Sequence, residues 1–122
     1  MGTRSIALLG ALVLAAGFHL AAASVASAGE MKVNIDMQAF APQMMKVHVG
    51  DRVTWTNHDE TEHFLTSSGP LTRGVATRVE DLEFHQRMVP GSEYSHTFRS
   101  PGVYAYFCAI HMGMSGTIVV EP

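Results

Sequence analysis

The sequence predicts an all-β protein, folded as an antiparallel sandwich of short strands. Runs rich in Val, Thr, Tyr and Phe alternate apolar with polar residues at a period of two, as in "RVTWTN" (52–57). Turn residues such as Gly50-Asp51 and "RSPG" (99–102) separate these runs at short intervals. No window of comparable length carries a clean apolar stripe with the 3.6-residue period of a helix. We therefore expect packed sheets rather than packed helices.

Each expected strand is marked by its own alternation. Val33 and Ile35 alternate with polar neighbours in "KVNID", and Val53 and Trp55 share one face of "RVTWTN". Between them, "KVHV" shows the same pattern and ends at a Gly-Asp turn. Later, "EYSHTF" leads through the turn "RSPG" into "VYAYFC", and "GTIVVEP" closes the chain. The expected strands cover residues 32–36, 46–49, 52–57, 93–98, 103–108 and 116–122.

The segment from Ser67 to Pro90 does not fit this pattern. It lacks clean alternation, carries Gly69, Pro70 and Gly74, and contains the mixed stretch "RVEDLEFHQRM". The sequence is compatible with either a short strand or a helical turn in this segment. A loop of this length in a small domain is more often functional or mobile than structureless. It is expected either to cover a site or to lie at the far end of the sandwich.

The first 28 residues have the three parts of a secretory signal peptide. Arg4 provides a basic start, an apolar run extends from Ile6 to about Ala23, and "ASA" (26–28) matches the small-x-small cleavage pattern. An uncleaved anchor is the alternative, because the run is near the lower length limit of a membrane span. Cleavage predicts a mature, periplasmic domain at residues 29–122, with no stable membrane insertion after cleavage.

Composition limits the classes of partner and of stabilising bond. The 122-residue chain has a net charge of −3, and removal of Arg4 leaves eleven acidic residues against seven basic ones. A mildly acidic chain without a basic stripe is not expected to bind nucleic acid. Its single cysteine excludes an internal disulfide, although small exported domains often rely on them. A bound metal would help to stabilise such a modest core, and we expect the protein to be a monomer.

The single cysteine belongs to a motif with metal-ligand spacing, Cys108-x-x-His111-x-x-Met114. Cys108 ends an expected strand in phase with Tyr104 and Tyr106, so its sulfur should point inward. The chain must then turn back quickly to begin the last strand, which can aim a thiolate, an imidazole and a thioether at one point. Soft sulfur donors favour copper, whereas zinc seldom takes Met. A buried Cys with a gap-filling Met is the structural alternative, but it does not explain the histidine.

A fourth donor is expected from another strand. His63 is favoured because "WTNHDETEHF" runs off the Trp55 strand and reaches His63 as the next strand begins, at an end of the sandwich. Two imidazoles, a thiolate and a distant thioether form the donor set of a blue-copper electron-transfer site. The other candidates are expected to lie in loops or on strand faces: His48, His58, His85 and His96.

The sequence that carries these residues resembles that of the cupredoxins, and within them that of the plastocyanin, amicyanin and pseudoazurin group. The matching stretches are "FAPQMMKVHVGDRVTWTN", "PGSEYSHTF", "SPGVYAYFC" and "CAIHMGMSGTIVV", which cover most of residues 40–120. The two-residue gap between His111 and Met114 is similar to the short ligand loop of amicyanin. The resemblance implies a Greek-key sandwich and one copper ion, Cu(I)/Cu(II). It implies equatorial ligands His63, Cys108 and His111 and the axial ligand Met114.

The chain departs from the family pattern in two respects, at Phe64 and in the segment from Ser67 to Pro90. Many family members carry Asn after the first histidine ligand, whereas this chain has Phe64. The backbone N–H of Phe64 is still expected to bond the Cys108 sulfur, but the side-chain link between the ligand loops is lost. Met112 does not match the axial position, and the segment from Ser67 to Pro90 has no confident counterpart.

The resemblance implies an electron carrier rather than an enzyme. Family members pass electrons at the edge of the C-terminal histidine, so redox partner proteins are expected to dock near His111, against Ile110, Met112 and neighbouring apolar residues such as Pro42, Met44 or Met45. The acidic run Asp59, Glu60 and Glu62 is interpreted as a solvated loop that favours Cu(II), with steering of a basic partner as the alternative.

The second hypothesis for the function is a periplasmic copper carrier or resistance protein. A multicopper oxidase would need His-x-His pairs, which the chain lacks.

Overall fold

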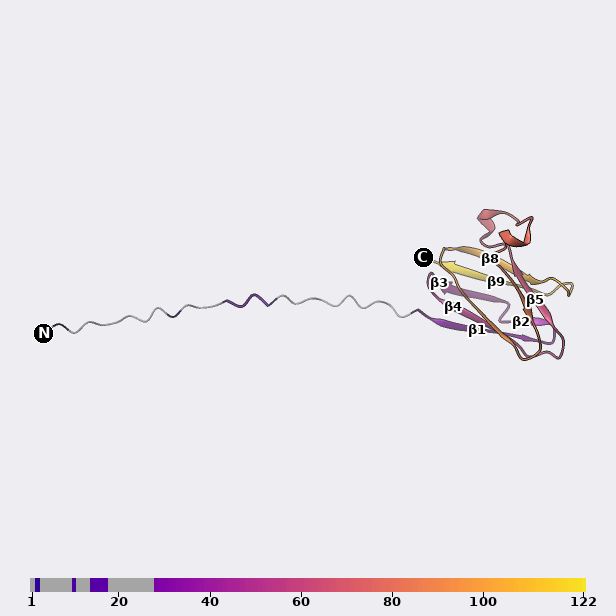
Figure 1. Ribbon diagram of the computed structural model, residues 1–122, viewed down its shortest axis with the longest axis horizontal. Coiled ribbons are helices and arrows are strands. Elements are labelled where there is room, and N and C mark those ends of the chain that lie inside the picture. The colour runs from indigo at the N-terminus through magenta and orange to yellow at the C-terminus, as the bar shows by residue number, and fades with distance from the viewer. Residues whose placement is uncertain (1, 3–9, 11–13, 18–27) are drawn as a thin grey trace.

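The computed structural model describes residues 2, 10, 14–17 and 28–122, and the chain from Gly29 onward folds into two packed β-sheets (Figure 1). Most of the expected signal peptide, residues 1–28, lies outside the described residues. Within the described part of the chain, no helix has both the length and the apolar character needed to cross a membrane.

The two sheets contain four and five strands. The four-stranded sheet has the order β2-β1-β4-β7, built from β1 (Glu30–Asp36), β2 (Ala39–Ala41), β4 (Arg52–Asn57) and β7 (Glu93–Thr97). The five-stranded sheet has the order β3-β9-β8-β5-β6, built from β3 (Met44–His48), β5 (His63–Ser67), β6 (Phe84–Met88), β8 (Gly102–Cys108) and β9 (Ser115–Glu121).

The predicted all-β sandwich is confirmed, with one correction to its pairing. β1 pairs with β4 in parallel, and β3 pairs with β9 in parallel, while the other pairs are antiparallel. Alternation along a strand reports which residues face inward, but it carries no information about the direction of the neighbouring strand. The expectation of antiparallel pairing therefore fails for these two pairs.

Aromatic side chains fill the space between the sheets. Trp55 is completely buried on β4, and its ring contacts Tyr106 of β8 edge to face, with centroids 5.5 Å apart. Tyr104 and Tyr106 are both buried, as their alternation predicts. Burial raises the pKa of Tyr106 to about 12, so this phenol stays neutral at physiological pH.

Gly116 allows the Tyr106 ring to lie against the backbone of β9. The two residues are direct partners in the β8–β9 ladder. A Cβ at position 116 would overlap the Tyr106 ring, with Cε1 only 2.7 Å away and the hydroxyl still closer. Because the backbone of Gly116 is ordinary strand, glycine is needed here for space and not for its φ angle.

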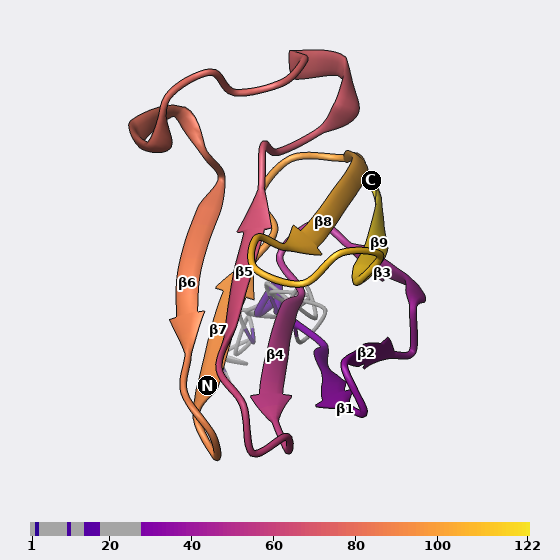
Figure 2. The ribbon, with the colours of Figure 1, turned by 90° about the vertical axis from the view of Figure 1, so that its right-hand side faces the viewer.

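The segment that lacked clean alternation contains both a strand and helical turns. Two 3₁₀ turns, η1 (Leu71–Arg73) and η2 (Val79–Asp81), precede β6, which pairs antiparallel with β5. Figure 2 shows the two turns beyond the end of β5, at the top of the view. The segment therefore extends from the end of β5 opposite His63. Neither turn buries a residue.

Asp51 fixes the turn between β3 and β4. Its buried carboxylate accepts hydrogen bonds from the backbone N–H groups of His48 and Gly29, both at 2.8 Å. The bond from His48, followed by that from Gly29, holds the pKa of Asp51 below its usual value despite burial.

We expect Asp51→Asn to make the free energy of unfolding fall less steeply as the pH is lowered. A lowered folded-state pKa contributes stability that is complete above the unfolded pKa of about 3.9 and is lost as pH falls through the folded value. Urea midpoints of the copper-free protein between about pH 3 and 7 should thus fall more steeply for wild type than for the variant. Asp36→Asn, which removes an exposed carboxylate, is the control and should keep the wild-type slope. Parallel curves for wild type and Asp51→Asn would contradict this role.

Candidate metal centre

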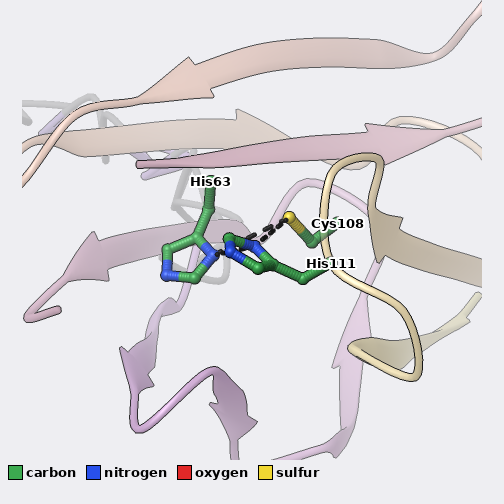
Figure 3. Close-up of side chains that lie close together, drawn as sticks. All are labelled: His63, Cys108 and His111. Carbon is green, nitrogen blue, oxygen red and sulfur yellow. Dashed lines mark hydrogen bonds between the residues drawn. The ribbon is translucent and has the colours of Figure 1, made fainter. Parts of the chain in front are cut away.

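Three of the residues singled out in the sequence converge at one end of the sandwich. The Nδ1 atoms of His63 and His111 lie 3.1 Å apart, and Cys108 Sγ lies 3.7 Å from the first and 3.3 Å from the second (Figure 3). Within the described residues, the ligand atoms of this trio all lie within 4.8 Å of one another. The cluster joins two segments that are 45 residues apart in the sequence.

Strand pairing and a tight loop bring these side chains together. His63 is the first residue of β5, and Leu65 faces Cys108 in the β5–β8 ladder. The β8–β9 loop (109–114) then reverses the chain, and the backbone N–H of Cys108 donates to the carbonyl of Met114 at 2.9 Å. Gly113 adopts a φ of 77° in this loop, a left-handed conformation that favours glycine. The loop thus returns His111 toward the Cys108 sulfur.

Burial differs between the two histidines. His63 is completely buried, and Cys108 is only 3% exposed. His111 is half-buried and reaches the surface on the β8–β9 loop. A metal at this position would therefore be shielded from solvent on the His63 side and accessible through the His111 edge.

The departure at Phe64 has a clear structural outcome. The backbone N–H of Phe64 donates to Cys108 Sγ at 3.4 Å, which confirms the predicted bond. The carbonyl of Phe64 accepts from the N–H of Ala109 at 3.0 Å, so backbone bonds link the two ligand segments without an Asn side chain. The Phe64 ring stacks on His85, with centroids 5.4 Å apart. The side chain is therefore engaged with β6 rather than with the β8–β9 loop.

The two methionines of the loop differ completely in environment. Met114 is buried, and it lines the same hollow as Cys108 and His111. Met112 is fully exposed. Met112 therefore lies at the surface next to His111 in the sequence, whereas the role of Met114 as a ligand stays a prediction.

The remaining histidine candidates lie elsewhere, each with its own partner. His48 lies within 3.9 Å of both Asp51 and Glu121. His58 is hydrogen-bonded to Asn34 and His85 to Thr66. His96 lies 3.1 Å from Glu83 and is mostly buried on β7. The structure brings none of these four side chains to the cluster: His48, His58, His85 and His96.

Asp59 is the part of the site that the sequence interpretation missed. Its carboxylate Oδ2 lies 2.8 Å from Nε2 of His63, and its side chain is only 12% exposed. Burial raises the pKa of Asp59, but hydrogen bonds from Gln38, His63 and Met37 outweigh this effect and leave the pKa below its usual value. The sequence treats Asp59 as one of several solvated acids. The only local signal is the spacing of a carboxylate four residues before a candidate ligand.

The donor set fits copper. A cysteine sulfur and two imidazole nitrogens converge in a buried position, and a buried thioether lies at the end of the same loop. Thiolate and thioether are soft donors suited to copper, and two His with one Cys and a weak Met form the donor set of electron-transfer copper sites. Zinc would prefer a carboxylate or a second thiolate in place of Met.

Comparison with known families places this arrangement among copper proteins. Residues 27–121 match the model of a family described as copper binding proteins, plastocyanin/azurin family. The chain is 37% identical over 109 residues to amicyanin-alpha of Methylorubrum extorquens, covering 88% of this chain and 85% of that protein. It is 34% identical over 114 residues to a chloroplastic plastocyanin of Tetradesmus obliquus, covering 89% and 77%.

Solved structures show the same likeness in three dimensions. The Cu(I) form of an amicyanin mutant superimposes with a TM-score of 0.64 at 33% sequence identity. The match covers 76% of this chain and 83% of that chain. An oxidised amicyanin mutant gives the same TM-score, identity and coverage.

Proposed function

This chain belongs to the plastocyanin/azurin family of copper-binding proteins, and from that membership we propose that it carries single electrons between redox proteins. The proposed copper ligands are His63, Cys108, His111 and Met114. The observation that carries the proposal is the convergence of three soft or imidazole donor atoms, His63 Nδ1, His111 Nδ1 and Cys108 Sγ, at one end of the sandwich.

Each proposed ligand has a role that follows from its position. Copper held by these residues would supply one-electron chemistry between Cu(I) and Cu(II). Cys108 provides the thiolate, and the Phe64 N–H bond to its sulfur limits the negative charge on that atom. His63 and His111 provide imidazole nitrogens, and the buried Met114 provides a weak thioether donor. The β5–β8 ladder holds His63 and Cys108 next to each other, and the short β8–β9 loop carries His111 and Met114, which suits a site that must serve two oxidation states.

The proposed role is electron transfer and not catalysis on a bound substrate. Catalytic metal sites usually keep one coordination position open for substrate or water. Here four protein donors are available to one ion, and three of their side chains are buried. The family relatives named above are an amicyanin and a plastocyanin, which supports the assignment as a carrier.

The surface around His111 is the proposed docking site for redox partner proteins. His111 is half-buried, and beside it Ile110 is 49% exposed and Met112 is fully exposed. Exposed apolar side chains gathered around one half-buried ligand edge favour brief contact with an apolar surface on another protein. The chain is proposed to act as a monomer, since no second copy is needed to complete the ligand set.

The proposed location is the periplasm. The basic start, the apolar run and the "ASA" cleavage pattern within residues 1–28 support export, and the family match begins at residue 27, next to the expected cleavage site. The mature protein is then the domain at residues 29–122.

Copper retention during redox cycling tests electron transfer against copper delivery. The exposed thioethers of Met44 and Met112 favour the delivery hypothesis, because thioethers suit Cu(I). The copper-loaded protein is reduced and reoxidised repeatedly in the presence of a Cu(I) chelator, and protein-bound copper is measured after each cycle. We expect bound copper to stay near one ion per chain. Stepwise loss on each reduction would support the copper carrier and contradict the electron carrier.

A further inference from the structure

The carboxylate of Asp59 holds the ring of His63 on the side away from the other donors. Asp59 Oδ2 lies 2.8 Å from His63 Nε2, while His63 Nδ1 faces Cys108 and His111 (Figure 3). One ring nitrogen of His63 therefore contacts Asp59, and the other faces the remaining donor atoms. An imidazole that donates Nε2–H to a carboxylate keeps its Nδ1 lone pair free to accept or to bind a metal.

Asp59 is itself fixed by the neighbouring hairpin turn. Its Oδ1 accepts from the N–H of Met37 at 2.7 Å, and its Oδ2 accepts from the N–H of Gln38 at 3.0 Å. Met37 and Gln38 both have positive φ angles, 50° and 55°, in the turn between β1 and β2. These two amides point at the same carboxylate, so its orientation toward His63 is defined from outside the loop that carries it.

The loop itself adds further restraints. The N–H of Asp59 donates to the side-chain oxygen of Asn57 at 2.9 Å. Asn57 is completely buried, and its amide donates to the carbonyls of Thr61 and Met88. The backbone from Asn57 to His63 is thereby held at both ends, which leaves the Asp59 carboxylate little freedom to rotate away.

We propose that Asp59 is a positioning residue for the metal centre. It holds the His63 ring through the Nε2–H bond and directs the Nδ1 lone pair toward Cys108 and His111, where the metal would lie. The proposal rests on the proposed function for the identity of the metal, but the ring position that it explains is already present in the structure. Partners of this kind affect metal affinity by about 10- to 100-fold when they are removed.

Three variants separate the effect of the Asp59–His63 hydrogen bond from the effect of negative charge and from the bonds between Asp59 and the β1–β2 turn. Asp59→Ala removes every acceptor. Asp59→Asn removes the charge, but its single oxygen can replace Oδ2 and serve His63 and Gln38, so that only the bond from Met37 is lost. Glu60→Gln removes one negative charge from an exposed neighbour and leaves Asp59 intact.

The first measurement is made on the copper-free protein by NMR, at about pH 8, above the ordinary pKa of histidine. The wild type should show a slowly exchanging Nε2–H proton for His63 and an unprotonated Nδ1. This proton signal should persist in Asp59→Asn and Glu60→Gln and should be lost in Asp59→Ala. A protonated Nδ1 in the wild type, or a slowly exchanging Nε2–H in Asp59→Ala, would overturn the proposal.

The second measurement is copper affinity by competition with a chelator of known strength. We expect about a 10- to 100-fold loss for Asp59→Ala, a smaller loss for Asp59→Asn and wild-type affinity for Glu60→Gln. Equal losses in Asp59→Ala and Asp59→Asn would show that Asp59 acts only through its charge or its bond to Met37 and not through the His63 Nε2–H bond, and would contradict the proposal. If the wild type itself binds no copper, the proposed function fails, whereas the NMR result on His63 still decides the role of Asp59.

Discussion

Replacing Cys108 with Ser is expected to abolish the visible absorption of the copper-loaded protein completely. An intense visible band in such a site arises from charge transfer between a cysteine thiolate and Cu(II), and Cys108 is the only cysteine of the chain. A serine hydroxyl is a hard donor and a poor substitute for a soft thiolate. The variant should therefore also bind copper more weakly and lose reversible redox activity. Visible and paramagnetic-resonance spectra of the loaded proteins measure the change in ligation, and voltammetry measures the redox activity.

Met112→Leu is the matched control for this experiment. Met112 lies in the same loop and carries sulfur, but its side chain is fully exposed. Its spectrum should be that of the wild type. An unchanged visible spectrum in Cys108→Ser would refute the assignment of Cys108 as a ligand. A changed spectrum in Met112→Leu would instead reassign the thioether donor.

Gly116→Ala is expected to produce a large loss of stability for the addition of a single methyl group. The new Cβ would overlap the Tyr106 ring, which is completely buried and packed against Trp55. The ring cannot move aside without displacing other core residues, and overpacking of this kind costs about 1–3 kcal/mol. For a domain of this size, the melting temperature should fall by about 4–8 °C per kcal/mol. Thermal and urea unfolding of the copper-free protein measure the effect.

The same overlap predicts a rescue by Tyr106→Phe. Within the described part of the chain, the buried Tyr106 hydroxyl has no hydrogen-bond partner, so its removal should cost little. The hydroxyl is also one of the atoms that the new Cβ would meet. Gly116→Ala should therefore cost less in the Tyr106→Phe background than in wild type. The ring carbons Cζ and Cε1 remain in phenylalanine, so the rescue should be partial. Strictly additive losses in the double variant would show that the hydroxyl takes no part in the clash.

The sequence was sufficient wherever a feature depended on neighbouring residues. Alternation correctly placed Tyr104, Tyr106 and Cys108 on the inward face of one strand, because side-chain direction in a strand depends only on position. The backbone bond from Phe64 to the Cys108 sulfur joins residues 44 apart, and its expectation comes from the resemblance to the cupredoxins; it forms because it does not depend on the side chain that replaces Asn. The spacing of Cys108, His111 and Met114 could likewise be interpreted from the sequence, because one short loop carries all the residues that follow Cys108 in this motif.

Several other features that depend on distant segments could not be predicted from the residue pattern. β6 shows little alternation because three of its five residues are exposed, and it forms a strand by pairing with the edge of β5. The parallel pairs of β1 with β4 and β3 with β9 depend on chain direction, which alternation does not encode. The role of Asp59 depends on two backbone amides that are 21 and 22 residues away. In the sequence alone, this aspartate resembles its solvated neighbours.

The long segment between β5 and β6 has a consequence for the unfolded chain. It lies between His63 and Cys108, so a copper ion bound by both residues would close a loop across 45 positions of sequence. A disulfide that closes a loop of this length lowers the entropy of the unfolded chain by an amount equivalent to about 4 kcal/mol. The cost of loop closure rises by only about 0.6 kcal/mol for each doubling of loop length. In the copper-loaded protein, the metal would thus act as a cross-link in a domain that has no disulfide, and the segment inside the loop could change in length with little effect on that contribution.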